Sequence, residues 1–193
     1  DSDAITADPT PTFIGTAPAQ SLVKVYKGGA LLGATSAEES GDWTLPNGQW
    51  ILEAGDKLTD GSHEITYTFT PDGGTTSDQS GPLSITVDAT PPEFTSGDAA
   101  NQIEEDSGAN QVVYTATTVD ESEVFYSLDQ TVGDYEKLEI DKISGEVTLT
   151  ENPSYELKPN YHFTVVATDI VGNAEEQEVS LSVIDKLSFI DDS

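Results

Sequence analysis

Apolar and polar residues alternate along much of the chain, and this period of two predicts β-strands rather than helices. Gly, Pro, Asn and Asp separate the alternating runs, and many short strands between turn residues are typical of β-sandwiches. We therefore expect an all-β fold. Four sets of apolar residues should each face a core: Ile65, Tyr67 and Phe69; Leu83, Ile85 and Val87; Tyr161, Phe163, Val165 and Ala167; and Val179, Leu181 and Val183.

The same order of elements occurs twice, at a spacing of about 100 residues, which is one sandwich length. Residues 63–88 read as a strand, an acidic loop, a second strand and an Asp, and residues 161–185 repeat that order. Pro91 and Pro92 stiffen the stretch between the copies, which suits a linker. We expect two tandem β-sandwiches joined end to end, over residues 1–90 and 91–193.

The negative charge of the chain limits the classes of partner that it can bind. The 193 residues include 36 Asp and Glu against 7 Lys and Arg, a net charge of −29. Nucleic acids and anionic membranes need basic patches, so we expect neither as a partner. No run approaches the roughly 18 apolar residues of a membrane helix, so membrane insertion is not expected. Self-repulsion favours a monomer, and the excess suits cations, although a merely solubilising acidic surface is the alternative.

The residue types leave little room for catalysis. The chain has no Cys and two His, which excludes disulfides, thiolate metal sites and a Cys nucleophile. It also has no G-x-S-x-G elbow, P-loop or dinucleotide fingerprint. We expect no enzymatic activity. Small extracellular domains without disulfides often need a metal as a staple. The chain has neither a starting Met nor a signal peptide, and we interpret it as a piece of a longer protein.

Several motifs of the first domain point to a family. They are a G-T-A start at 15–17, a G-x-W strand at 41–43, an L-x-D-G-x-H turn at 58–63 and a V-D-x-T-x-P exit at 87–92. In these features the first domain resembles the bacterial Ig-like repeats of large surface adhesins. The resemblance implies a β-sandwich whose partners are the adjacent repeats of the same adhesin.

The second domain carries a different set of motifs. Residues 138–147 match an F-x-I-D-x-x-T-G-x-I hairpin, residues 154–156 stand where D-Y-E would be, and residues 161–173 read Y-x-F-x-V-x-A-x-D-x-x-G-N. In this order the domain resembles a cadherin repeat. Ig-like and cadherin-like repeats occur together in giant calcium-dependent RTX-type adhesins of Gram-negative bacteria. The resemblances together cover nearly the whole chain and imply an extracellular location at the bacterial cell surface.

The expected topology gathers carboxylates at the junction of the two domains. In a sandwich of seven strands, the loop before the last strand lies at the end where the chain enters. In the second domain this loop holds Asp169 and Asn173, and the incoming linker holds Asp88 and Glu93. Two carboxylates about 4 Å apart repel by about 4 kcal/mol at an effective dielectric near 20. Lysines are too few to neutralise them.

Calcium suits this junction best. Ca²⁺ takes 6–8 oxygen ligands in flexible geometry, whereas Zn²⁺ prefers nitrogen and sulfur, and Mg²⁺ demands a near-ideal octahedron. We therefore expect a Ca²⁺ site between the domains. Two alternatives stay open: a plain turn at Asp169 and Asn173, and a solvated strand end at Asp88.

The cadherin resemblance implies a second Ca²⁺ site at the opposite end of the second domain. A Glu near its first strand, matched by Glu104 or Glu105, would join Glu156 and the exit residue Asp185. Ser154 replaces the Asp of D-Y-E, which implies a weaker site or one that needs a following domain. The first domain repeats the arrangement at its own incoming end. There Asp72 and Asp78 in the loop and Asp8 in the incoming segment would be ligands, with a solvated surface loop as the alternative.

We expect a calcium-rigidified extender module that projects distal binding domains from the cell. The rival hypothesis is an adhesive module that itself binds a sugar or protein ligand. Trp50 and Tyr135 could stack on sugars, but we assign both to the core or its rim. An exposed aromatic cluster would favour the rival hypothesis, and closed sites between domains would favour the extender.

Overall fold

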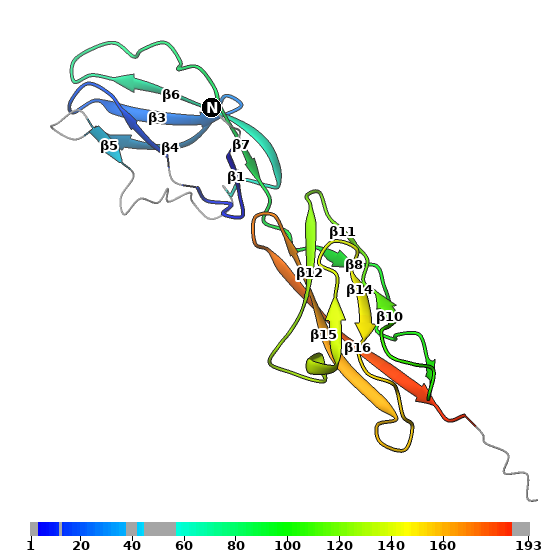
Figure 1. Cartoon of the computed structure of the whole chain (residues 1–193). Helices are drawn as coiled ribbons and strands as arrows, with labels where there is room; N and C mark the ends of the chain where they lie inside the picture. Colours follow the sequence, from blue (N-terminus) through cyan, green and yellow to red (C-terminus); the bar gives the residue numbers. More distant parts are fainter. Residues whose placement is uncertain (1–3, 12, 38–41, 45–56, 187–193) are drawn as a thin grey trace, which may run out of the picture. The chain divides into compact units, whose positions relative to one another are not determined.

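The computed structural model describes residues 4–11, 13–37, 42–44 and 57–186. These residues form β-strands and one short 3₁₀ helix, η2 (Tyr135–Lys137), so the predicted all-β fold is confirmed. The chain divides into two compact units, Asp1–Thr90 and Pro91–Ser193 (Figure 1). No helix within the described ranges is long and apolar enough to span a membrane.

The first unit packs two sheets. β1 runs parallel to β7, and the other pairs are antiparallel. The larger sheet has the order β1 (Ala4–Thr6), β7 (Leu83–Val87), β6 (Gly61–Thr70), β3 (Leu22–Lys27) and β4 (Ala30–Ser36), and the smaller pairs β2 (Ile14–Thr16) with β5 (Asp42–Thr44).

The core of the first unit follows the alternation in the sequence. Val23 and Val25 of β3 are buried against Ile65, and Tyr67 and Phe69 pack on the same cluster. The prediction for β6 is therefore confirmed. The prediction for β7 is only partly right, because Ile85 and Val87 are buried but Leu83 is 50% exposed. Leu83 is the first residue of its strand and lies at the border of the core.

The second unit has a four-stranded sheet, a three-stranded sheet and a short pair. β9 runs parallel to β16, as β1 does to β7 in the first unit. The four-stranded sheet is β12 (Val124–Leu128), β15 (Asn160–Asp169), β16 (Ala174–Ile184) and β9 (Ile103–Glu104); the three-stranded sheet is β10 (Gln111–Thr115), β14 (Glu146–Leu149) and β13 (Leu138–Ile140); the pair is β11 (Thr118–Val119) with β8 (Glu93–Phe94).

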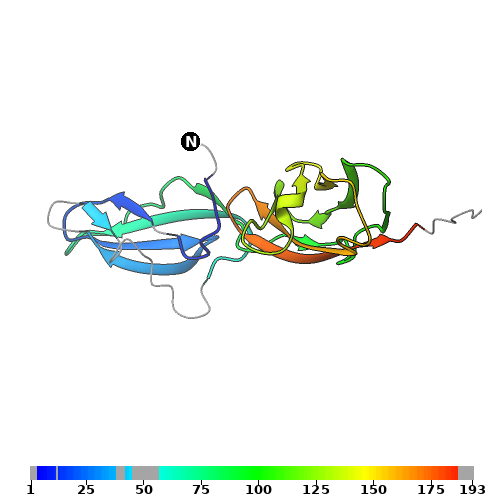
Figure 2. The ribbon, with the colours of Figure 1, turned by 60° about the horizontal axis from the view of Figure 1, so that its bottom comes forward.

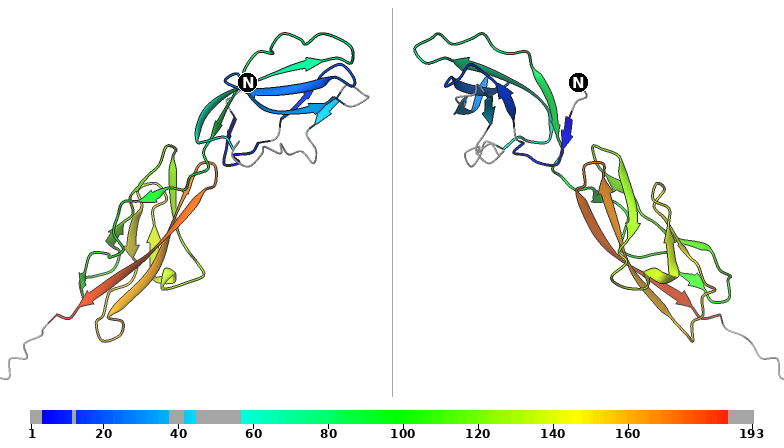
Figure 3. Two further views of the ribbon diagram at one scale, coloured as in Figure 1. Left: turned by 180° about the vertical axis from the view of Figure 1, so that it is seen from behind. Right: turned by 60° about the vertical axis from the view of Figure 1, so that its left-hand side comes forward.

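The long antiparallel pair β15–β16 builds the core of this unit (Figure 2; Figure 3). Tyr161 lies opposite Leu181 and Phe163 opposite Val179, and each of these four side chains is at most 2% exposed. Full burial of such a side chain contributes about 1.5–3 kcal/mol. The inward faces predicted for both strands are therefore confirmed.

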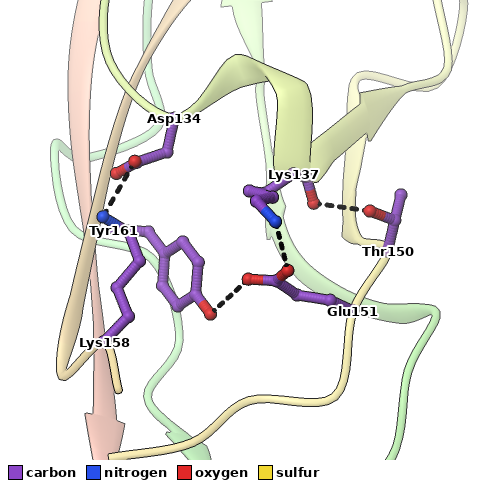
Figure 4. Close-up of polar contacts among 6 residues, drawn as sticks. All are labelled: Asp134, Lys137, Thr150, Glu151, Lys158 and Tyr161. Carbon is purple, nitrogen blue, oxygen red and sulfur yellow. Dashed lines mark hydrogen bonds and ion pairs between the residues drawn. The ribbon is translucent and has the colours of Figure 1, made fainter.

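Two ion pairs fasten the η2 turn to the connection between β14 and β15 (Figure 4). Lys137 Nζ lies 2.7 Å from Glu151, and Lys158 Nζ lies 2.8 Å from Asp134. The Tyr161 hydroxyl donates to Glu151 Oε1 at 2.9 Å, which joins this charged belt to the core. Burial, together with the neighbouring Glu151 carboxylate, raises the pKa of Tyr161 to about 12.

Candidate metal centre

Three carboxylates meet where the chain leaves the second unit. Oxygens of Glu105, Glu156 and Asp185 all lie within 4.8 Å of one another, and we call this group the exit cluster. The residues come from three segments. Glu105 directly follows β9, Glu156 lies in the connection between β14 and β15, and Asp185 directly follows β16. The parallel register of β9 and β16, with Ile184 opposite Glu104, brings the two strand ends together.

Glu105 is the anchored member of the exit cluster. Its side chain accepts the backbone N–H of Lys186 at 2.7 Å and that of Tyr155 at 3.2 Å. The bond from Lys186 lowers the pKa of Glu105 against the opposing effect of burial. Glu105 is only 8% exposed, and its two hydrogen bonds fix the carboxylate at the end of the domain. It already ties the exit segment to the connection that carries Glu156.

The other members of the cluster lack a positive partner. Burial, followed by the adjacent Glu105 carboxylate, raises the pKa of Asp185. The ion pairs of the described residues are Lys137–Glu151 and Lys158–Asp134, so no lysine in that part of the chain neutralises the exit cluster. Three like-charged oxygens at this spacing repel one another and attract a cation.

The donor set fits Ca²⁺. All three donors are carboxylates, the hard oxygen ligands that Ca²⁺ prefers, with no thiol or imidazole in the group. Ca–O distances of 2.3–2.6 Å place ligands on opposite sides of an ion about 5 Å apart. Oxygens within 4.8 Å of one another therefore fall in the range that a single Ca²⁺ spans.

Asp169 is fixed by its own loop. Its Oδ1 accepts the backbone N–H groups of Val171, Gly172 and Asn173 at 2.9, 2.6 and 2.9 Å. Its Oδ2 accepts the Asn173 side-chain amide at 2.6 Å. Asn173 thus acts here as a donor to Asp169. This is the turn geometry that the sequence left open as the alternative to a metal site.

Asp120 is a neighbour of Asp169 that sequence reasoning missed. Carboxylate oxygens of the two residues lie within 4.8 Å, and Asp120 also accepts the N–H and hydroxyl of Ser122 at 2.7 Å. Val124 of β12 pairs with Asp169 of β15, so the loop before β12 lies beside the loop after β15. The register between these strands is the signal that would have found Asp120, and it depends on tertiary structure.

Asp88 and Glu93 are the two ligands predicted in the linker. Asp88 follows β7, and its backbone N–H donates to Thr6 at 2.9 Å. A Ca²⁺ ion shared by Asp88 and Asp169 stays a prediction, because the two residues belong to different units. Glu93 lies on β8 and borders a hollow of about 390 Å³ together with Glu175 and Glu176. Within the described residues, Glu93 is not part of a three-ligand group.

The other predicted ligands lie apart from the exit cluster. Glu104 is exposed and, as the neighbour of Glu105 at a strand end, points to the opposite face. Asp8 accepts the N–H and hydroxyl of Thr10 at 2.7 and 2.8 Å, so it closes a local turn. Asp72 is an exposed loop residue. Trp50 lies outside the described residues.

Residues 1–89 match the family model described as a bacterial Ig-like domain. No curated protein matches the sequence. The first unit is therefore similar to a bacterial Ig-like domain, and the second unit shares its all-β character.

Several cadherin structures are among the solved structures that match this chain. Protocadherin gamma B2 domains 3–6 share 26% identity over 50% of this chain, with a TM-score of 0.45. Drosophila N-cadherin EC1-3 shares 18% over 95%, with a TM-score of 0.47, and mouse clustered PcdhgC3 EC1-3 shares 17% over 89%, with a TM-score of 0.49. This chain spans 23%, 64% and 56% of those three chains, respectively.

Proposed function

We propose that this chain is a calcium-rigidified extender module of a bacterial cell-surface adhesin. Its task is mechanical: it projects distal binding domains away from the cell, and its partners are the adjacent repeats of the same protein. The Ig-like match over residues 1–89 supports the bacterial repeat context. The acidic excess, with a net charge of −29, supports a role for cations.

The observation that carries the proposal is the place of the exit cluster. Asp185 is the first residue after β16, so whatever holds its carboxylate also holds the direction in which the chain leaves the domain. Glu105 and Glu156 belong to the body of the domain. A cation bound by all three would fasten the outgoing segment to that body and stiffen the joint to the next repeat.

The roles of the three residues differ. Glu105, with its two backbone hydrogen bonds, is positioned before a cation arrives and loses little conformational freedom on binding. The side chains of Glu156 and Asp185 are exposed and would close on the ion. Bound Ca²⁺ supplies a divalent charge that removes the repulsion among the three carboxylates.

Calcium should therefore raise the stability of the protein. Extracellular Ca²⁺ modules have Kd values around 10⁻⁴–10⁻³ M. At ten times Kd, one site adds about 1.4 kcal/mol to the free energy of unfolding. Calorimetry in chelator, in Ca²⁺ and in Mg²⁺ measures this gain, which should be largest in Ca²⁺.

A pair of matched variants assigns the gain to the exit cluster. Glu156→Gln should lose most of the Ca²⁺-dependent rise in Tm, whereas Glu146→Gln, an exposed carboxylate outside the exit cluster, should keep it. Identical melting curves in chelator and Ca²⁺ would overturn the proposal.

We also propose that the module is monomeric and has no catalytic activity. The acidic surface favours the monomer through self-repulsion. Light scattering in Ca²⁺ tests it, and a stable dimer would instead support adhesion between identical copies.

A further inference from the structure

A groove of about 460 Å³ opens in the second unit between β12 and β13. β12 is the outer strand of the four-stranded sheet and β13 the outer strand of the three-stranded sheet. Among the described residues, no further strand pairs with the outer edge of either. The backbone hydrogen bond from Tyr126 to Lys142, at 2.9 Å, crosses between the two segments. We call this the β12–β13 groove. Its volume lies in the range of about 300–1,000 Å³ typical of small-molecule sites.

The two walls of the groove are fixed by contacts that do not involve the exit cluster. β13 continues directly from the η2 turn, and Lys137 in that turn is fixed to Glu151 by an ion pair of 2.7 Å. On the other side, β12 is paired along its length with β15. Because both walls are anchored independently, the groove is preformed, which lowers the entropic cost of binding a ligand.

The floor and the rim of the groove have different chemistry. Tyr126, Leu128 and Ile140 line it and pack against the core, so they present a semi-apolar floor. The Tyr126 hydroxyl is within 2.8 Å of the Thr118 hydroxyl, which fixes that ring in place.

The rim carries hydrogen-bonding groups that the fold does not use. Gln130, Tyr135 and Glu139 border the groove. Within the described residues, none of these three side chains has a hydrogen-bond or ion-pair partner. An amide, a phenol and a carboxylate thus border the semi-apolar floor, and together they offer both donors and acceptors.

We propose that the β12–β13 groove binds a neutral sugar ring. The floor suits the C–H face of a pyranose, and the three rim groups suit its hydroxyls. Glu139 and the net charge of −29 disfavour anionic sugars and acidic peptides. This role goes beyond extension, and it needs no calcium because no member of the exit cluster borders the groove.

The test is a titration of the ¹⁵N-labelled chain with methyl glycosides of glucose, galactose, mannose and N-acetylglucosamine, followed by NMR in chelator and again in Ca²⁺. At least one glycoside should shift amides of residues 126–130 and 135–140 in a saturable manner, with the same affinity in both conditions. Glu139→Gln and Gln130→Ala should each weaken binding by about tenfold. Glu146→Gln, outside the groove, should change it less than twofold.

Several results would overturn the proposal. They are the absence of saturable shifts with all four glycosides, shifts confined to other parts of the chain, or binding that disappears in chelator. Stronger shifts of the same amides by a Lys-rich peptide would reject the sugar and assign the groove to a peptide. Tyr135→Ala adds a third variant whose folding is checked by its amide dispersion, and the two polar rim variants carry the test if it does not fold.

Discussion

Two groups of carboxylates in the second unit have opposite surroundings. In the charged belt, Asp134 and Glu151 each face a lysine at 2.8 and 2.7 Å. In the exit cluster, three carboxylates face one another within 4.8 Å. The belt uses its lysines to fasten the η2 turn to the connection between β14 and β15. No lysine of the described residues pairs with the exit cluster, so its charge is neutralised by a cation from solution or by protons. The same residue types therefore make a permanent brace in one place and, in our proposal, a cation-dependent one in the other.

This difference shows that net charge alone does not locate a metal site. Asp169 makes the point again, because it is buried and yet satisfied by backbone N–H groups of its own loop. A carboxylate indicates a cation when the fold brings it to other carboxylates and leaves some of their oxygens without a donor. In the exit cluster, Glu105 accepts two backbone N–H groups and Glu156 accepts the Ser154 hydroxyl at 3.4 Å, whereas Asp185 accepts no N–H or hydroxyl of the described residues. By that criterion, the exit cluster is the stronger candidate.

The largest effect is expected from Asp169→Ala. Its loss leaves three backbone N–H groups without their shared acceptor, which should cost about 2 kcal/mol of unfolding free energy. Urea denaturation in chelator measures this cost, with Glu176→Gln as a control nearby in sequence. A change below about 0.5 kcal/mol would mean that the loop does not depend on Asp169.

Tyr161→Phe tests the charged belt. The variant keeps the buried ring but removes the 2.9 Å hydrogen bond to Glu151, at an expected cost of about 1.5 kcal/mol. Its Ca²⁺-dependent rise in Tm should equal that of the native protein, because no hydrogen bond in the described part of the chain links the Tyr161 side chain to the exit cluster. A variant that lost the calcium response would show that the two regions are coupled.

Glu156→Gln tests the exit cluster without metal. Removing one of three repelling charges should raise the Tm in chelator by about 2 °C, so the sign is opposite to that of the two changes above. Differential scanning calorimetry at low ionic strength measures the shift, which salt should reduce. A lower Tm would mean that Glu156 is already neutralised within the protein.

The smallest effect concerns acid. The hydrogen bond from Lys137 is the main cause that lowers the pKa of Glu151 in the folded protein. The pairing therefore stabilises the protein at pH values above the pKa that Glu151 has in the unfolded chain. This stabilisation is lost as the pH falls through the lower pKa of the folded state. The Glu151 side chain is 34% exposed, so screening keeps this contribution below about 1 kcal/mol. Between pH 5 and pH 3, the Tm of Glu151→Gln should fall less with decreasing pH than the Tm of the native protein.

The sequence predicts the fold well because burial depends on local alternation. The inward sets on β15 and β16 needed no knowledge of other strands. The ligand set is different, since it depends on which strand ends meet. The choice between Glu104 and Glu105 follows from strand parity at β9, and Asp120 could not be found without the pairing of Val124 with Asp169. The turn around Asp169 was visible as an alternative, but its three N–H donors were not.

The most direct measurement is a Ca²⁺ titration of the metal-free, ¹⁵N-labelled chain, followed at the amides of Lys186 and Tyr155. Both amides donate to Glu105, so they report on the exit cluster itself. We predict saturable shifts of both amides with a Kd around 10⁻⁴–10⁻³ M, weaker shifts with Mg²⁺, and a loss of affinity of at least about tenfold in Glu156→Gln. If Ca²⁺ shifted other amides and left these two unchanged, the exit cluster would not be the calcium site.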